Sequence, residues 1–212
     1  MKLLHSISFL LITLASIASS DSIKTNDIPF DLNGSNFTYP WPVKVFQFLG
    51  QRSQPLEMAF MDIAPNCQAS NCKGNGKTAV LLHGRNFCGP TWNVTAIALA
   101  SVGYRVILPD QVGFCKSSKP DSYQYSLQQL AANTLALLKI LQVEKITLIG
   151  HSMGGMLGSR FALMYPANVT ELVLVNPSMS DKYSLFKTMI LLTRRCSWTR
   201  RLESKGGTVY QH

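Results

Sequence analysis

Short apolar runs alternate with longer helical patterns through the middle of this 212-residue sequence. Residues 78–82, 104–108, 145–149 and 171–175 are mostly apolar or β-branched, and each run stops before a glycine, proline or polar residue. Such short, bounded runs are typical of buried strands. Two earlier segments, 43–48 and 56–63, are also predicted to be strands, with residues 50–55 as the turn between them.

Between these runs, residues 92–102, 126–141 and 153–165 have apolar positions at helical spacing and are predicted to be helices. Ser126 followed by Gln129 is the capping-box pattern that begins a helix. Alternating strands and helices from residue 78 onward predict an α/β fold, with a mostly parallel central sheet and helices on both faces. An apolar patch at 185–192 could form one more helix, and no further strand pattern follows it.

The first 20 residues, MKLLHSISFLLITLASIASS, combine Lys2, an apolar stretch and small residues before a cleavage site. This is the pattern of a secretory signal peptide. The alternative is an uncleaved membrane anchor, but His5 and several serines interrupt the stretch. We therefore expect a secreted or secretory-pathway protein that begins near Ser19 or Asp21 and keeps no stable membrane span after cleavage.

Sequons and cysteines fit that compartment. Four Asn-x-Ser/Thr sequons predict a glycoprotein, at Asn33, Asn36, Asn93 and Asn168. There are five cysteines, Cys67, Cys72, Cys88, Cys115 and Cys196. In an oxidising compartment Cys67 could pair with Cys72, and Cys88 with Cys115, which leaves Cys196 over. The alternative is that some of them are small buried apolar residues.

The net charge of +9 raises the question of a nucleic-acid partner. Residues 21–181 carry only +2, whereas residues 182–212 carry +6. The excess therefore belongs to the tail, where a basic run predicts a solvated, disordered end. No nucleic-acid-binding motif accompanies it, so we expect no nucleic-acid partner.

The candidate nucleophile is Ser152, in the sequence Gly150-His151-Ser152-Met153-Gly154. A predicted strand precedes this G-x-S-x-G motif and a predicted helix follows it, which is the setting of a nucleophile elbow. Side chains at positions 150 and 154 would collide with the strand and helix at so sharp a turn. The free amides at the N-terminus of the helix would favour developing negative charge.

Residues 78–177 resemble the first part of an α/β-hydrolase domain. The matching motifs are LLHGRNFCGPTW (81–92), LPDQVGFCKSSKP (108–120), GHSMGG (150–155) and LVLVNP (172–177). They are similar to those of esterases, proline iminopeptidases, epoxide hydrolases and haloalkane dehalogenases. The resemblance implies an oxyanion hole formed by the backbone amides of Arg85 and Met153. Cys115 stands where most of the family has glycine, which makes a disulfide to Cys88 in the neighbouring loop plausible.

Three residues near these motifs are interpreted as structural. His151 precedes the serine in the elbow, so its side chain should point away and pack instead of acting as the base. His83 is expected to organise its loop by hydrogen bonding near Asp110, and the resemblance implies that Asp110 is structural. Serine in the elbow, instead of the aspartate of dehalogenases and epoxide hydrolases, implies acyl transfer. Carboxylic esters are the expected small-molecule substrates, with amides, thioesters or carbon–carbon cleavage as alternatives. No cofactor and no metal are expected.

The catalytic acid and base are not evident. In this fold they follow the serine along the chain as Asp or Glu and then His. The only downstream histidine is His212, with Asp181 as a weak candidate for the acid. We therefore expect residues 1–20 to be a signal peptide, 21–177 the N-terminal part of the hydrolase domain, and 178–212 an atypical basic tail from truncation or a frame shift. The last strands and the cap would then be missing.

Two functional hypotheses follow. The first is a secreted serine hydrolase acting on carboxylic esters through an acyl-enzyme, impaired because the acid and base are missing. The second is a non-catalytic secreted fragment or interaction protein that retains the elbow.

Overall fold

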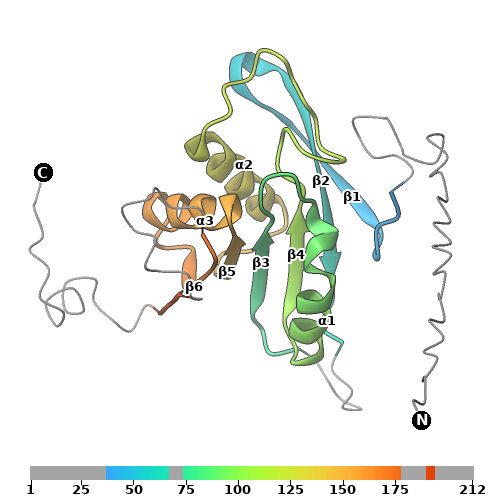
Figure 1. Ribbon diagram of the computed structural model, residues 1–212, viewed down its shortest axis with the longest axis vertical. Coiled ribbons are helices and arrows are strands. Elements are labelled where there is room, and N and C mark those ends of the chain that lie inside the picture. Colours follow the sequence, from blue (N-terminus) through green and yellow to red (C-terminus); the bar gives the residue numbers. More distant parts are fainter. Residues whose placement is uncertain (1–36, 67–73, 178–189, 194–212) are drawn as a thin grey trace, which may run out of the picture.

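The computed structural model describes residues 37–66, 74–177 and 190–193, and Figure 1 shows their arrangement. These residues form a seven-stranded sheet with three α-helices. The strands are β1 Val43–Leu49, β2 Pro55–Ile63, β3 Thr78–Leu82, β4 Arg105–Pro109, β5 Ile146–His151, β6 Val169–Val175 and β7 Ile190–Thr193. The helices are α1 Asn93–Ser101, α2 Leu127–Ile140 and α3 Met153–Met164, with 3₁₀ turns at Gln51–Ser53 and Gly89–Trp92.

The sheet order is β1-β2-β4-β3-β5-β6-β7. The four central strands β4, β3, β5 and β6 are parallel, while β1 pairs antiparallel with β2, β2 with β4, and β6 with β7. The predicted α/β class and the mostly parallel sheet are therefore confirmed. Every predicted strand is present, with bounds that differ by at most two residues.

One strand was missed. Residues 190–193 form β7 along the edge of β6, so the expected helix over 185–192 is wrong for its last residues, and residues 185–189 lie outside the described part. The local pattern of four apolar or β-branched residues suits a helix or a strand equally. Pairing with the open edge of β6 is a tertiary interaction that the pattern does not contain.

The alternation of side chains along each strand separates two hydrophobic clusters. In β3, Val80 and Leu82 pack with α2 and α3, whereas Ala79 and Leu81 pack with α1 on the opposite face. All four side chains are fully buried. Because successive strand residues point to opposite faces, helices cover both sides of the sheet, as the sequence predicted.

The N-terminal end of α2 is capped as expected. The Ser126 hydroxyl accepts a hydrogen bond from the Gln129 N–H at 3.1 Å. The reciprocal half of the capping box is absent among the described contacts, because the Gln129 side chain bonds to Gln51 and Asn133 instead. The helix therefore begins where the sequence placed it, with one of the two capping bonds.

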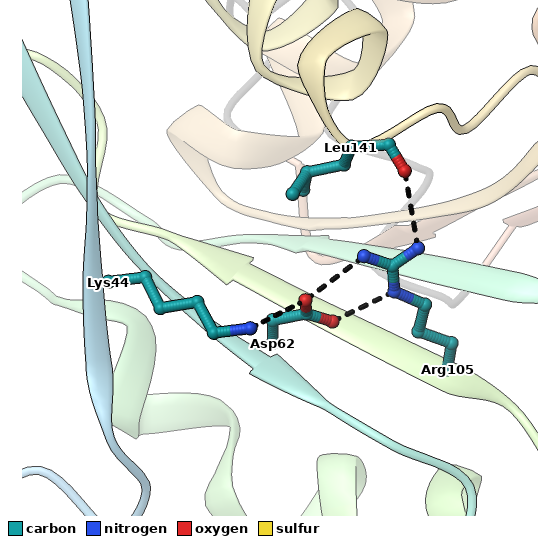
Figure 2. Close-up of polar contacts among 4 residues, drawn as sticks. All are labelled: Lys44, Asp62, Arg105 and Leu141. Carbon is teal, nitrogen blue, oxygen red and sulfur yellow. Dashed lines mark hydrogen bonds and ion pairs between the residues drawn. The ribbon is translucent and has the colours of Figure 1, made fainter.

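An ion cluster joins the antiparallel end of the sheet to α2, as Figure 2 shows. The Arg105 guanidinium donates to both carboxylate oxygens of Asp62, at 2.8 and 3.0 Å, and to the Leu141 carbonyl at the end of α2 at 3.4 Å. Lys44 adds a third bond to Asp62 at 3.0 Å. The Arg105 hydrogen bonds hold the pKa of Asp62 below its usual value, against the opposing effect of burial.

Candidate active site

Ser152 lies at the turn between β5 and α3, as the motif predicted. Its backbone has φ 53° and ψ −117°, a left-handed conformation that costs a non-glycine residue about 1–3 kcal/mol. The Ser152 N–H donates to the Val175 carbonyl of β6 at 3.1 Å, and its carbonyl accepts from the N–H groups of Gly155 and Met156. Both neighbouring elements therefore hold the strained turn in place.

Two glycines allow this turn. A Cβ added at Gly150 would collide with the Gly154 carbonyl, and one added at Gly154 would collide with the Leu82 carbonyl at the end of β3. The start of α3 thus packs directly on the backbone that follows β3. This contact places Ser152 at the carboxyl edge of the parallel strands, where α/β proteins carry their sites.

The loop after β3 reaches the serine through Gly84. A Cβ built on Gly84 would lie 3.3 Å from the Ser152 Cβ and 2.9 Å from the His151 Nδ1 atom. Arg85, the next residue, is exposed, and its amide belongs to the loop that touches Ser152. The Met153 amide lies in the first turn of α3, where N–H groups have no acceptor within the helix. These are the two amides that the sequence proposed for an oxyanion hole.

His83 holds the base of this loop. The Gln111 N–H donates to Nε2 of the imidazole at 3.0 Å, so Nε2 carries no proton and Nδ1 donates to the Gly84 carbonyl at 2.9 Å. The ring is buried, and burial lowers the pKa of His83. With both nitrogens occupied, His83 organises the loop, as the sequence predicted, and does not serve as a base for Ser152.

Asp110 connects this loop to the one that follows β4. Its buried carboxylate accepts from the Gly89 N–H at 2.8 Å, from the Lys116 N–H at 3.2 Å and from the Tyr39 hydroxyl. Burial raises the pKa of Tyr39, and its bond to Asp110 adds to that rise. Asp110 therefore has a scaffolding role, in line with the sequence interpretation.

His151 faces aromatic rings. Its imidazole lies edge-on to Phe87, at 5.9 Å between ring centroids, and to Trp92 at 6.4 Å. Both rings come from the loop after β3, so the half-buried His151 packs against the loop that carries Arg85. Among the residues that the structure describes, His83 and His151 are the only histidines, and neither is placed as a catalytic base.

A disulfide joins Cys88 to Cys115 and links the loops after β3 and β4. Cys115 has φ 46°, in the left-handed region that favours glycine. Glycine, which the resemblance places at this position in most of the family, adopts such a φ without steric cost. Cys67, Cys72 and Cys196 lie outside the described residues, so their pairing stays a prediction.

Of the remaining candidate residues, only Asn93 and Asn168 lie in the described part of the chain. Asn93 is the first residue of α1, and the half-buried Asn168 donates from its side chain to the Glu144 carbonyl at 2.9 Å. Asn33, Asn36, Asp181 and His212 lie outside the described residues. In the described part of the chain, no helix is both long and apolar enough to cross a membrane.

A groove beside Met153 was not foreseen from the sequence. It has a volume of about 400 Å³ and is lined by Gly113, Phe114, Tyr125, Ser126, Leu127, Leu130 and Met153. Met153 directly follows Ser152 in the sequence, whereas Ser152 itself is not among the lining residues. No local pattern signals it, because its walls come from the loop after β4, the start of α2 and the start of α3.

Comparisons with known proteins agree with this geometry. A family model described as the alpha/beta hydrolase fold matches residues 78–202. The chain is 36% identical over 110 residues to a cis-3-alkyl-4-alkyloxetan-2-one decarboxylase of Shewanella oneidensis, covering 49% of this chain and 33% of that protein. It is 34% identical over 104 residues to a 2-hydroxy-6-oxo-2,4-heptadienoate hydrolase of Pseudomonas putida, covering 48% and 38%. The chain thus spans between a third and two fifths of these curated relatives.

Solved structures show the same likeness. A probable hydrolytic enzyme from Pseudomonas aeruginosa is 57% identical with a TM-score of 0.62, covering 66% of this chain and 43% of that one. A thermophilic esterase from Thermogutta terrifontis is 26% identical with a TM-score of 0.54, covering 64% and 46%.

Proposed function

The chain belongs to the α/β-hydrolase fold family, because the family model covers more than half of it, and from this premise we propose that it is a serine hydrolase with Ser152 as its nucleophile. The observation that carries the proposal is the strained backbone of Ser152 between β5 and α3, with the Gly84 loop against its side chain. Strained backbone is maintained at functional sites because the surrounding structure holds it. Here Gly150 and Gly154 make that structure possible.

The proposed reaction is acyl transfer to water. The Ser152 Oγ attacks a carbonyl carbon, and the oxygen of the tetrahedral intermediate accepts hydrogen bonds from the Arg85 and Met153 amides. The proton lost by the Ser152 hydroxyl passes to the leaving alkoxide as the carbonyl reforms, so that an alcohol departs. Water then attacks the acyl-enzyme, which releases the acid and returns a proton to Ser152. Each such amide contributes about 3 kcal/mol to transition-state stabilisation in comparable sites.

Carboxylic esters are the proposed substrates. Serine in the elbow supports acyl chemistry, and one of the similar structures is that of an esterase. The groove beside Met153 is largely apolar, with Phe114, Leu127 and Leu130 in its walls, and would suit an apolar acyl or alcohol group.

The base is the unassigned part of this mechanism. Within the described residues, both nitrogens of His83 are hydrogen-bonded and His151 packs against Phe87 and Trp92. We therefore propose that these 212 residues supply the nucleophile and the oxyanion donors while their turnover is impaired. The same observation favours the second candidate function, a non-catalytic secreted protein that retains the elbow.

Chemical rescue tests the proposal. Without additive, the chain should hydrolyse an activated ester no faster than Ser152→Ala, because loss of the triad base removes most of the catalytic effect. Added imidazole should then raise the rate of the unmodified chain above that of Ser152→Ala. Ser159→Ala, which removes another hydroxyl from α3, is the matched control and should respond to imidazole like the unmodified chain.

Each opposite result is decisive. Equal stimulation of the Ser152→Ala variant by imidazole would refute the nucleophile and favour the non-catalytic candidate. Ser152-dependent turnover without imidazole would refute the impairment. If His212→Ala abolished that turnover, the base would be assigned to the tail.

We also propose that the protein is exported. The signal-peptide pattern of residues 1–20, the four sequons and the Cys88–Cys115 disulfide support this. The expected result in eukaryotic cells is a mature N-terminus near Ser19 or Asp21 and a loss of mass on deglycosylation. Retention of Met1 with no mass change would contradict it.

A further inference from the structure

Cys88, Asp110 and Cys115 gather three potential metal ligands between the loops after β3 and β4. Two Sγ atoms and a carboxylate oxygen lie within 4.8 Å of one another. Asp110 is buried beneath them, while both cysteines are partly exposed. We propose that, once the Cys88–Cys115 disulfide is reduced, these three residues bind one thiophilic divalent cation such as Zn²⁺. The two loops would then be joined either by a disulfide or by a metal.

Once the disulfide is reduced, the separation of the two cysteine Cα atoms allows tetrahedral coordination. With Zn–S bonds of about 2.3 Å and Zn–O bonds of about 2.0 Å, the two sulfurs must lie about 3.8 Å apart and each about 3.5 Å from the oxygen. The Cα atoms of Cys88 and Cys115 are 5.9 Å apart, so rotation about the Cα–Cβ bonds can separate the sulfurs with little backbone movement. Three protein ligands leave a fourth position for water.

The carboxylate is already oriented for this role. Asp110 Oδ1 accepts from the Gly89 N–H, and Oδ2 accepts from the Lys116 N–H and the Tyr39 hydroxyl. A carboxylate has about four acceptor positions, so one on Oδ1 is left for a metal. Outer partners that fix a ligand in this way strengthen metal binding.

Two lysines lie beside Cys115. The Lys119 ammonium donates to the carbonyl of Cys115, and Lys116 is adjacent to Cys115 in the chain. A bound dication also offsets the two thiolates and the Asp110 carboxylate.

Metal binding follows reduction of the Cys88–Cys115 disulfide. A phosphine reductant takes oxygen from water to become a phosphine oxide, and the two electrons and two protons convert the S–S bond into two thiols. The metal then displaces both thiol protons as its bonds to sulfur form.

Cobalt titration tests the site. The full chain carrying Cys67→Ser, Cys72→Ser and Cys196→Ser keeps only the two thiols of interest. After phosphine reduction it should bind one Co²⁺, with the intense visible bands of tetrahedral cobalt and a thiolate charge-transfer band. The same chain left oxidised should show neither. Equal cobalt binding by the oxidised chain, or none by the reduced chain, would overturn the proposal.

Single substitutions in that background separate the ligands. Cys88→Ser and Asp110→Asn should each weaken Co²⁺ binding at least about tenfold. Asp121→Asn removes an exposed carboxylate further along the same loop, and should leave the affinity unchanged. Unchanged affinity in Asp110→Asn would exclude the three-ligand site. If that variant fails to fold, X-ray absorption of the zinc-loaded background chain decides: two sulfurs plus oxygen support the site, and one sulfur or none overturns it.

Discussion

Replacing Asp62 by asparagine tests how the antiparallel end of the sheet is held to α2. The Asp62 side chain is 11% exposed and bridges Arg105, 32% exposed, and Lys44, 54% exposed. Asparagine keeps one acceptor oxygen but loses the charge and the second acceptor for the guanidinium. Because bonds to a charged partner contribute about 1.5–3 kcal/mol when poorly exposed, we expect Asp62→Asn to lower the free energy of unfolding by about 2 kcal/mol near neutral pH.

The loss of unfolding free energy in Asp62→Asn should depend on pH. The Arg105 bonds place the folded pKa of Asp62 below its unfolded value of 3.8. Stability from this carboxylate is therefore fully present above the unfolded pKa and is lost as the pH falls through the lower, folded pKa. The difference between the parent chain and Asp62→Asn should shrink steadily from about pH 5 downward.

Urea unfolding followed by circular dichroism, at neutral pH and at about pH 3, measures both effects. Lys44→Met is the matched control, since it removes only the exposed partner and should cost less than about 0.5 kcal/mol. If Asp62→Asn lowers the free energy of unfolding no more than Lys44→Met at neutral pH, the Arg105–Asp62 bonds do not stabilise the sheet as proposed. An equal loss in Asp62→Asn at both pH values would refute the role of the carboxylate charge.

Two further pairs of substitutions test the packing of the elbow and of α3 by the same unfolding measurement. Gly154→Ala puts a Cβ against the backbone carbonyls at the end of β3 and should destabilise the chain by about 1–3 kcal/mol. Gly158→Ala meets only side-chain atoms, of Leu172 at 3.3 Å and of Leu148 at 3.7 Å, and should be neutral or stabilising. Equal effects of the two would contradict the steric account of the motif. Phe161→Ala empties a fully buried site on α3 and should cost about 3–5 kcal/mol. Leu163→Ala, at a position 65% exposed, should cost less than about 0.5 kcal/mol, and a comparable loss in both would show that α3 does not pack as described.

The sequence alone determined the class of the fold and the place of the candidate nucleophile, Ser152, at the turn between β5 and α3. Strands, helix starts and the elbow depend on short-range patterns: the apolar run before Gly150, the cap at Ser126, and glycines where a Cβ does not fit. These constraints act between residues a few positions apart, so they can be read along the chain. The structural role of Asp110 came from the resemblance, and those of His83 and His151 from their places beside the motifs; the contacts agree with all three.

Only the tertiary structure decided which distant segments meet. It inserted β4 between β2 and β3, added β7 to the edge of β6, and formed the groove at Met153 from three separate segments. It also joined Cys88 to Cys115 beside the buried carboxylate of Asp110, which brings the two sulfurs and a carboxylate oxygen within 4.8 Å of one another. These contacts join segments that are far apart in the sequence, and they depend on the order of the strands in the sheet. The hydrophobic pattern of one segment does not specify which other segment it will lie beside.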